Sequence, residues 1–436
     1  MEGRRIIMEW VLVKNLKSHV GKEVELRGWV YNQRASGKIR FIILRDGTGT
    51  VQCVLVKAEN PELFEKASEL TQESSVILTG SVREEPRSPS GVEITLISFR
   101  IIGRADPYPI TLKEHGVDFL SENRHLWIRT PRQSAILRIR STVEQACREF
   151  LHGRDFVLAD SPIITPAACE GTSTLFEINY HEEKAYLSQS GQLYNEATAM
   201  ALNRIFCFGP TFRAEKSKTR RHLMEFWMLE AEAAFFEYED NLRLQEELVY
   251  HLVSTVLERH SQDLRLLNRD TAKLEAISLP FPRVSYTDAV QTLISEGHQI
   301  QWGEDFGAPQ ETAISEKHQS PVFITHFPTS IKAFYMEPDP SNPEVIMGAD
   351  MLAPEGYGEI IGGSQRISDP ELLRKKIADH NLPADTFNWY LDLRRYGTVP
   401  HSGFGLGIER TVAWLCGIEH VREAIPFPRT LYRMYP

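Results

Sequence analysis

The sequence predicts an α+β protein with two domains: a small closed β-barrel of the OB type, then a larger domain in which helices flank an antiparallel sheet. Two observations predict this fold class. Five short β-rich runs follow one another near the N-terminus, and beyond them helices and strands alternate irregularly. A parallel sheet would require regular repetition of strand and helix. The chain of 436 residues is long enough for two or three domains.

The predicted barrel occupies residues 1–103. Its apolar and polar residues alternate in the runs VELRGWVY, IRFIIL, TVQCVLV, SVILTGSV and VEITLISF, which are separated by turn-forming pieces such as SGK, DGTG and PRSPSG. A helix is predicted from Leu63 to Leu70, between the third and fourth strands. Barrels of this type often bind single-stranded nucleic acid through aromatic side chains and a positive rim. A purely structural barrel is the alternative.

The second domain is predicted to follow a linker. Two prolines in DPYP, at 106–109, end the barrel pattern, so residues 104–130 are predicted as the linker and 131–436 as the second domain. Helical spacing of apolar residues predicts a helix from Ser134 to Leu151. Asp240 is expected to cap a second helix. Strands are predicted in DFVLADSPIITP, AYLSQS, RIFCFGPTFR and FWMLEAEAAF.

Composition excludes several classes of protein. Hydrophobic residues make up 42% and charged residues 25% of the chain, which is typical of a globular domain rather than a disordered one. No stretch approaches the roughly 18 apolar residues of a membrane helix, and the N-terminus lacks the pattern of a secretory signal. Five cysteines without a CxxC pair indicate reduced thiols. We therefore expect a cytoplasmic protein without a membrane partner.

The charge distribution constrains any nucleic-acid partner. Lysine and arginine number 49 against 59 aspartates and glutamates, a net charge of −10, which disfavours indiscriminate binding to nucleic acid. A nucleic acid must therefore meet a local basic patch. Within the barrel, Arg34, Lys38 and Arg40 provide such a patch.

The stretch GPTFRAEKSKTRRHLMEF, from Gly209 to Phe226, is the strongest candidate for an anion site. The chain carries no GxxxxGK[ST] phosphate loop. Here a strand is predicted to enter a basic loop and return on a second strand. Arg213 and Glu215 should share a face of the outgoing strand, Arg221 and His222 should lie at the far edge of the loop, and Phe226 could offer its ring to a base. A solvated surface loop is the alternative.

Three separated motifs resemble those of the class II aminoacyl-tRNA synthetases. FRAE followed by RHLMEF resembles motif 2, GFGLGIER resembles motif 3, and the helix before FVLADSPII, with Pro162, resembles motif 1. Together with the barrel, KEHGVDFLSENRHLWIR and EIIGGSQR, nearly the whole chain resembles the aspartate/asparagine/lysine subgroup. The resemblance implies an antiparallel catalytic sheet, an anticodon-binding OB domain and a homodimer built around motif 1. The chain departs from the family pattern at Asp155, where glycine is usual, and at Ala231, where proline is usual.

The resemblance also implies a two-step reaction. An amino-acid carboxylate attacks the α-phosphate of ATP, and a ribose hydroxyl of tRNA then attacks the aminoacyl-adenylate. Such chemistry depends on positioning and charge neutralisation. By correspondence, Arg213 bridges the α-phosphate and the substrate carboxylate, while Arg410 takes the γ-phosphate. The implied catalytic residues are Arg213, Arg410 and Glu359; the implied ATP-binding residues are Arg213, Glu215, Arg221, His222, Phe226, Glu359 and Arg410; the implied Mg²⁺ ligands are Asp350 and Glu359.

The amino-acid pocket favours asparagine. Aspartate enzymes of the subgroup carry SPQLYK or SPQLFK, whose lysine pairs with the substrate β-carboxylate, whereas this chain has SGQLYN with Asn195 at that place. An asparagine side chain needs one donor and one acceptor. We expect Arg366 to donate and Glu225 to accept, with Glu230 next in line. Glu170, Ser190 and Gln192 resemble the groups that hold the substrate ammonium.

The expected partners are L-asparagine and tRNA(Asn). In the barrel, Phe41, Gln52 and Glu93 resemble residues that contact the anticodon, although Phe41 could instead be a core residue. The runs SGQLY, EFWMLE, IKAFYM and GEIIGGSQR resemble asparaginyl enzymes more than aspartyl ones. Three alternatives stay open: a non-discriminating aspartyl enzyme that charges both tRNA(Asp) and tRNA(Asn), a paralogue that only binds RNA or a partner, and a relative of asparagine synthetases.

We predict amino-acid-dependent exchange of pyrophosphate into ATP by the purified protein in magnesium buffer without tRNA. L-Asparagine should support the exchange and L-aspartate should not, because a poorly paired carboxylate is costly to bury. Exchange with aspartate would contradict the assignment of the pocket. Exchange with neither amino acid would favour the binding protein.

Overall fold

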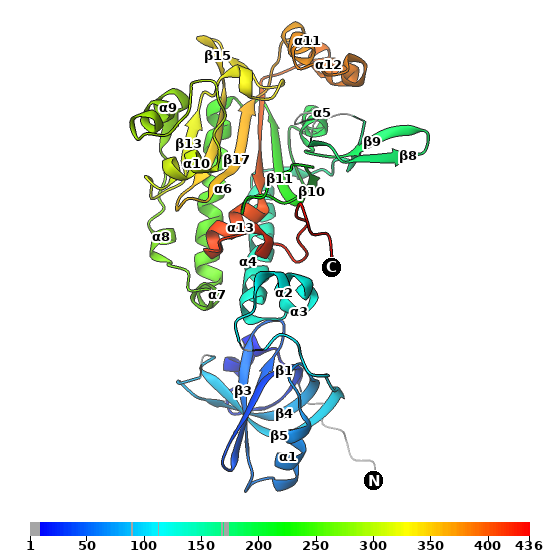
Figure 1. Cartoon of the computed structure of the whole chain (residues 1–436), viewed down its shortest axis with the longest axis vertical. Coiled ribbons are helices and arrows are strands. Elements are labelled where there is room, and N and C mark those ends of the chain that lie inside the picture. The colour runs from blue at the N-terminus through cyan, green and yellow to red at the C-terminus, as the bar shows by residue number, and fades with distance from the viewer. Residues whose placement is uncertain (1–8, 89, 112, 167–168, 170–173) are drawn as a thin grey trace. The chain divides into compact units, whose positions relative to one another are not determined.

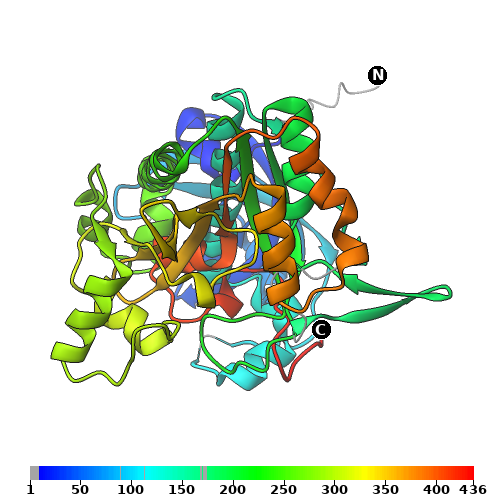
Figure 2. The ribbon, with the colours of Figure 1, turned by 90° about the horizontal axis from the view of Figure 1, so that it is seen from above.

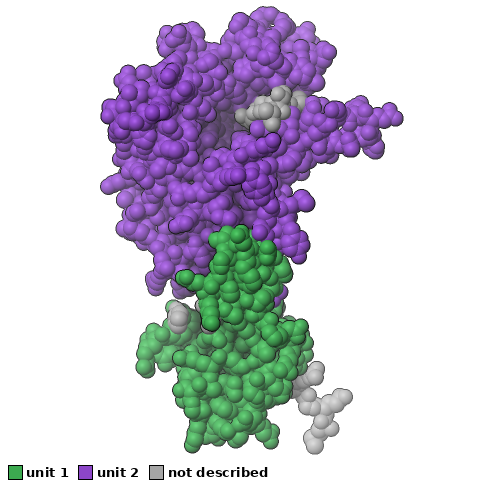
Figure 3. All heavy atoms as spheres, viewed as in Figure 1, with its two compact units in different colours: residues 1–127 green, residues 128–436 purple. Residues whose placement is uncertain are grey.

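The computed structural model describes residues 9–436 except 89, 112, 167–168 and 170–173. The chain divides into two compact units, residues 1–127 and 128–436 (Figure 3). The predicted linker contains two short helices, α2 (Val117–Glu122) and α3 (Arg124–Trp127), which group with the first unit.

The first unit contains the predicted closed five-stranded barrel, with strand order β1-β2-β3-β5-β4. Its strands are β1 (Glu23–Ser36), β2 (Ile39–Arg45), β3 (Thr50–Val56), β4 (Ser75–Glu84) and β5 (Val92–Gly103). A 3-10 helix, η1 (Val13–His19), precedes the barrel, and α1 (Pro61–Lys66) with the short turn η2 (Ala67–Glu69) lies between β3 and β4, where a helix is predicted. The side chain of Asn60 caps α1 by accepting from the backbone N–H of Leu63.

Alternation along the strands separates the interior of the barrel from its outer face. Ile42 and Cys53 lie opposite each other and are fully buried. Their neighbours Phe41 and Val54 also lie opposite each other and, because side chains alternate, point to the other face. Phe41 is therefore an outer residue of the barrel and not part of its interior.

The second unit is built on an eight-stranded sheet. The six central strands are antiparallel, as predicted, while each edge strand pairs in parallel with its neighbour. In spatial order the strands are β12 (Arg283–Ser285), β13 (Val322–Thr325), β16 (Gly348–Ala353), β17 (Gly358–Gln365), β18 (His401–Gly407), β11 (Glu225–Ala234), β10 (Arg204–Phe212) and β6 (Val157–Leu158).

Three helices cover one face of this sheet, namely α4 (Pro131–His152), α6 (Tyr238–Arg259) and α13 (Ile408–Cys416) (Figure 1). Their buried apolar residues form one core with those of β10, β11, β17 and β18. α4 begins as its sequence requires, with Pro131 in the first turn and the Thr130 hydroxyl accepting from the backbone N–H of Gln133. The other face of the sheet is left for a site.

Two further helices, α7 (Ser261–Leu266) and α8 (Ala272–Glu275), pack against α6 and add to the same core. The helices outside this core are α5 (Gln192–Leu202), α9 (Tyr286–Ser295), α10 (Ala308–Ser315), α11 (Pro370–Asp379) and α12 (Asn388–Arg395). Two small sheets contain β7 (Ile164–Thr165), β9 (Glu183–Leu187) and β8 (Glu177–Tyr180), and β14 (Pro338–Asp339) with β15 (Asn342–Ile346). The β8–β9 hairpin extends away from the main sheet in both views (Figures 1 and 2).

Two elements differ from their predictions. The stretch DFVLADSPIITP contains only two two-residue strands, β6 and β7, in different sheets. α6 begins at Tyr238, so Asp240 is not its cap residue: Glu237 caps it, and Asp240 completes a capping box by accepting from the backbone N–H of Glu237.

Asp155 adopts the backbone conformation that explains why glycine is usual at its place. Its φ angle is +63°, in the left-handed region that glycine enters without a steric penalty and that aspartate tolerates better than most residues. Asp155 therefore keeps the turn between α4 and β6.

All five cysteines are buried. Among the residues described, no helix is both long and apolar enough to cross a membrane.

We predict that Arg140→Ala lowers the free energy of unfolding of the second unit by about 3–5 kcal/mol, because it leaves the carboxylate of Glu409 buried without its cation. Arg140 joins α4 to α13: its Nη1 donates to Glu409 Oε1 at 2.7 Å and to the carbonyl of Ala424 at 2.9 Å. Burial raises the pKa of Glu409 despite this partner. Urea unfolding followed by circular dichroism measures the loss.

The matched control is Arg259→Ala, which removes an exposed ion pair between α6 and α4. Arg259 lies 3.4 Å from Glu149, and both side chains are more than two-fifths exposed. Such pairs contribute about 0–1 kcal/mol. Equal losses in the two variants would contradict the structural role of Arg140.

Candidate active site

Two adjacent cavities lie on the face of the main sheet that α4, α6 and α13 leave open. The central strand β11 explains their position. Leu229, Ala231 and Ala233 point into the core, so the alternating residues Met228 and Glu230 point to the other face, where they line the cavities.

Glycines on β18 keep this face open. Gly407, Gly405 and Gly403 lie opposite Met228, Glu230 and Glu232, whereas the residues between them, Phe404 and Leu406, are buried in the core. A Cβ at Gly405 would lie 2.4 Å from Cε of Met228, and one at Gly403 would lie 1.9 Å from Oε2 of Glu232. The alternation of glycine and large residues in GFGLG therefore gives β18 one face with large side chains, toward the core, and one face without side chains, toward the cavities.

The first cavity gathers the charged residues predicted from the β10–β11 loop (residues 213–224) and from motif 3. Arg410 donates through Nη1 to the backbone carbonyl of Glu359 at 2.9 Å and to its carboxylate at 3.2 Å. Burial raises the pKa of Glu359, but Arg410, Lys332 and Arg213 outweigh it and hold the pKa below its ordinary value. The cavity is lined by Arg213, Glu215, Arg221, His222, Leu223, Phe226, Met228, Glu359, Ile360, Gly405, Gly407, Glu409, Arg410 and Val421.

Arg221 and His222 are held by different partners. The buried guanidinium of Arg221 donates to Glu311 at 2.8 Å, to Thr312 at 2.5 Å and to the carbonyl of Gly356, so it also fastens the loop to α10. The His222 ring contacts the hydroxyls of Ser217 and Thr219. Burial lowers its pKa, and Arg410 adds to the effect, which favours the neutral imidazole.

The second cavity is lined by residues of four strands (β11, β16, β17 and β18), of α5 and of the segment 331–336. It includes Ser190, Gln192, Asn195, Arg213, Met228, Glu230, Ala231, Glu232, Asp305, Ile331, Lys332, Ala333, Tyr335, Met336, Asp350, Glu359, Gly362, Gly363, Arg366, Phe404 and Gly405. Arg213, Met228, Glu359 and Gly405 line both cavities. The two cavities therefore meet at an arginine and a carboxylate.

Arg366 is fixed by a buried carboxylate. Its Nη2 donates to Glu232 Oε2 at 2.8 Å and its Nε donates to Oε1 at 3.1 Å, while Nη1 donates to the Ser364 hydroxyl at 2.9 Å. A guanidinium carries five N–H groups, so N–H groups remain on Nη1 and Nη2. Arg366 can thus hold Glu232 and still donate to a ligand.

Asp350 and Lys332 form a second, partly buried pair, 2.6 Å apart. Burial raises the pKa of Asp350 to about 7, with Lys332 opposing the shift and Glu359 adding to it. The two carboxylates of Asp350 and Glu359 therefore repel each other in a place where an additional cation would relieve them.

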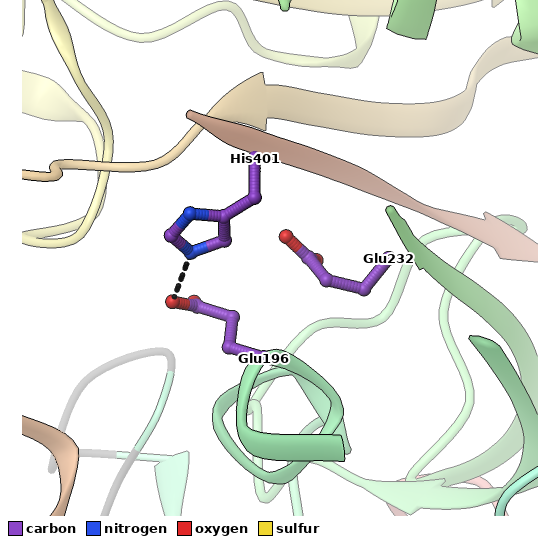
Figure 4. Close-up of side chains that lie close together, drawn as sticks. All are labelled: Glu196, Glu232 and His401. Atoms are coloured by element: carbon purple, nitrogen blue, oxygen red, sulfur yellow. Dashed lines mark hydrogen bonds and ion pairs between the residues drawn. The ribbon is translucent and has the colours of Figure 1, made fainter. Parts of the chain in front are cut away.

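A buried charge network lies next to the second cavity (Figure 4). Glu196 on α5 accepts from Arg394 at 2.6 Å, from the Tyr390 hydroxyl at 2.7 Å and from Gln192 at 3.2 Å, and its Oε2 lies 3.0 Å from Nε2 of His401. Ligand atoms of Glu196, Glu232 and His401 lie within 4.8 Å of one another. Because both carboxylates are already paired with arginines, we interpret the cluster as support for Gln192 and not as a metal site.

The structure brings most of the predicted site residues together. The seven predicted ATP-binding residues line the first cavity, and Ser190, Gln192, Arg366, Asp350 and Glu359 line the second. Glu170 lies outside the described residues. The predicted placement of Glu225 is corrected: it lines neither cavity, because strand alternation puts it on the opposite face of β11 from Phe226.

Glu230, the second candidate for the acceptor, does lie in the cavity. It accepts from the Ser190 hydroxyl and, at 2.8 Å, from the backbone N–H of Gly191. Asn195 also lines this cavity, and its side chain is engaged by the Ser161 hydroxyl at 2.8 Å and by Cys207 Sγ at 3.3 Å. Period-two alternation from Phe226 would have pointed to Glu230 before Glu225.

Sequence reasoning missed Lys332 and the network around Glu196. Lys332 lies in the run IKAFYM, but nothing in its neighbours predicts the pairing with Asp350. Glu196 and His401 are 205 residues apart. No local signal joins such residues.

On the barrel, the three predicted residues share the outer face of β2, β3 and β5. Gln52 lies beside Glu93 on the parallel pair β3–β5 and donates to it at 3.0 Å. Phe41 lies diagonally across β2–β3 from Gln52. Arg34 covers the Phe41 ring, with its guanidinium carbon 4.8 Å from the ring centroid. An aromatic ring, an amide and a cation are the groups that bind single-stranded bases.

Comparison with known proteins finds two matching families. Residues 116–431 match the model described as tRNA synthetases class II (D, K and N). Residues 24–102 match the model described as OB-fold nucleic acid binding domain. The two matches together span most of the chain.

Similar proteins and structures extend over nearly the full length. Proteins named asparagine–tRNA ligase from Desulforamulus reducens and Pelotomaculum thermopropionicum are 67% and 68% identical, and each match covers 98% of this chain and 100% of the relative. The crystal structure of asparaginyl-tRNA synthetase from Pyrococcus horikoshii complexed with asparaginyl-adenylate has a TM-score of 0.92 at 44% identity. That match covers 96% of this chain and 97% of the other.

Proposed function

The chain belongs to the class II tRNA synthetases (D, K and N), and on that premise we propose that it is an asparagine–tRNA ligase. It activates L-asparagine with ATP to asparaginyl-adenylate and transfers the asparaginyl group to the 3′ end of tRNA(Asn). One observation carries the proposal: a cavity with cations and a partly buried ring meets a cavity with paired donors and acceptors, and Arg213 and Glu359 line both.

The first step follows from this junction. ATP binds in the first cavity, with its adenine against Phe226 and its amino group donating to Glu215. Arg213, at the junction, contacts both the α-phosphate and the substrate carboxylate and brings the two anions together. Arg410 takes the γ-phosphate, and the imidazole of His222 donates to the terminal phosphates. No side chain acts as a nucleophile, so the rate depends on orientation and charge neutralisation.

Asparagine is selected in the second cavity by one donor and one acceptor. The free N–H groups of Arg366 donate to the side-chain carbonyl, and Glu230 accepts from the side-chain NH₂. Ser190 and Gln192, with Glu170, bind the substrate ammonium. Aspartate would place a carboxylate against Glu230, where its charge is repelled, and Asn195 offers no cation in compensation. This arrangement opposes the aspartyl alternative.

Magnesium is proposed to bind Asp350 and Glu359. A Cβ at Gly362 would lie 3.0 Å from Oε1 of Glu359 and 3.5 Å from Oδ1 of Asp350. The absent side chain thus leaves room between two carboxylate oxygens, which are the ligands that Mg²⁺ prefers. The ion, when bound, would neutralise phosphate charge and orient the phosphates.

The enzyme is proposed to be a cytoplasmic homodimer. β6 is an edge strand of the main sheet, and the segment from β6 to β7 exposes Val157, Leu158, Ile163 and Ile164, each by 41–44%. A second copy of the chain would cover this apolar edge. The buried thiols are typical of a reducing compartment.

The barrel is proposed to bind the anticodon through Phe41, Gln52 and Glu93.

We predict that Glu230→Gln lowers the ratio of kcat/KM for asparagine to that for aspartate by roughly tenfold to a hundredfold. The variant removes the charge that repels aspartate and supplies an NH₂ that can donate to it. Pyrophosphate exchange with each amino acid measures the ratio. Glu225→Gln, on the same strand but the other face, is the matched control and should leave the ratio unchanged. Loss of selectivity in Glu225→Gln alone would return the acceptor role to Glu225.

We predict that the wild-type enzyme charges a tRNA(Asn) transcript with asparagine, and that Phe41→Ala raises the KM for this tRNA roughly tenfold, as expected for the loss of one stacked base. Pyrophosphate exchange should be unchanged in this variant, because it requires no tRNA. Trp10→Ala is the control. Trp10 is 54% exposed, and the guanidinium of Arg27 lies over its ring, so it resembles Phe41 with Arg34. It forms a β-bridge with Glu25, on the part of β1 that pairs with β4 and not with β2. A wild-type enzyme that exchanges pyrophosphate but charges no tRNA would contradict the proposed ligase.

A further inference from the structure

The C-terminal segment exposes three large side chains where a folded chain would normally bury them. Tyr432 is 76%, Met434 80% and Tyr435 71% exposed. We call these three residues the C-terminal ledge. Contiguous exposed apolar groups of this kind mark interaction sites, and none of the roles described above uses them.

The ledge has a defined shape. Thr430 and Arg433 exchange backbone hydrogen bonds, with N–H to O distances of 3.1 and 3.2 Å, and this pairing forms a tight hairpin with Tyr432 at its turn. The side chain of Arg429 donates to the backbone oxygen of Pro436 at 2.8 Å. The end of the chain is therefore folded back onto the start of the segment.

The segment is fastened to the β10–β11 loop. The backbone N–H of Met224, the last residue of that loop, donates to the carbonyl of Arg429 at 2.8 Å, and Glu225 forms a bridge with the same residue. Residues of the loop line the first cavity. The ledge thus lies beside a loop that reaches from the surface to the proposed reaction centre.

The same loop places cations next to the ledge. Lys218 Nζ lies 5.1 Å from the centroid of the Tyr432 ring, and Lys216 and Arg220 are exposed in the same loop. The chain as a whole carries a net charge of −10, so this is a local positive surface. Aromatic rings interleaved with cations are the surface that single-stranded nucleic acid recognises, because bases stack on rings while phosphates pair with cations.

We propose that the C-terminal ledge stacks an unpaired nucleotide of the 3′ end of the tRNA, with Tyr432 as the ring and Lys218 as the phosphate contact. This inference rests on the proposed function, in which that end must reach the adenylate beside Arg213. It assigns the last residues of the chain to the transfer step and leaves asparagine activation independent of them.

A thermodynamic cycle tests the contact. Dissociation constants are measured for tRNA(Asn) and for the same tRNA without its unpaired 3′ nucleotides, with the wild-type enzyme and with Tyr432→Ala. Removing the nucleotides should weaken binding to the wild type about tenfold more than it weakens binding to the variant, because the variant has already lost the stacking contact. Tyr432→Trp should restore the dependence on the 3′ nucleotides, since it retains a ring.

Tyr396→Ala is the matched control. Tyr396 is 74% exposed and has its own cation, with the guanidinium carbon of Arg395 5.5 Å from its ring, but it follows α12, away from the C-terminus (Figure 1). This variant should behave like the wild type in both tRNA measurements. Asparagine-dependent pyrophosphate exchange should be unchanged in all three variants.

Three outcomes would overturn the inference. Equal effects of 3′ truncation on the wild type and on Tyr432→Ala would show that the ledge does not contact the nucleotides. Loss of the native oligomeric mass in Tyr432→Ala, measured by sedimentation, would show that a second copy of the chain covers the ledge. An equal effect of Tyr396→Ala would show that the response is unspecific. Failure of the wild type to exchange pyrophosphate with asparagine would instead refute the proposed function.

Discussion

The ion pair between Arg366 and Glu232 is the constraint on which the second cavity depends. Arg366 follows β17, Glu232 lies on β11, and β18 runs between these strands. The pair therefore crosses β18, and it can do so only because Gly403 has no side chain there. Burying two charges is costly unless each is fully partnered, and the bidentate contact to Glu232 meets that need while N–H groups of Arg366 stay available. A structural ion pair thereby becomes a rigid donor for a ligand.

The other glycines of β18 also leave space on the cavity face of the sheet. Its glycines face the cavities, and its large residues face the core shared with α4, α6 and α13. The strand thus contributes fully to the stability of the sheet while leaving its other face flat. A substrate can then approach the backbone of the sheet closely, and the charged groups that surround it come from neighbouring strands and helices.

The two cavities differ in the charges that line them. The first collects arginines, which suit the phosphates of a nucleotide, and the charge of Glu359 is held there by Arg410. In the second, Lys332 and Arg366 already have carboxylate partners in Asp350 and Glu232. A neutral amide suits such a balanced site better than a carboxylate does, because it adds no charge that must be compensated. In the proposed function, selectivity for asparagine would therefore follow from charge balance as well as from individual hydrogen bonds.

The sequence alone determined the barrel, the helices α4 and α6 and the strands β10 and β11, because these follow from local periodicity. The resemblance of its motifs to those of the synthetases implied the gathering of Arg213, Glu359 and Arg410. Only the tertiary structure decided which face of β11 lines the cavities, and it places Glu230 there and not Glu225. It also brought Glu196 to His401, which is 205 residues away, and the C-terminal hairpin to the β10–β11 loop. Such contacts follow from the order and register of strands and from the helices packed behind them, and these are properties of the assembled sheet that no single segment carries.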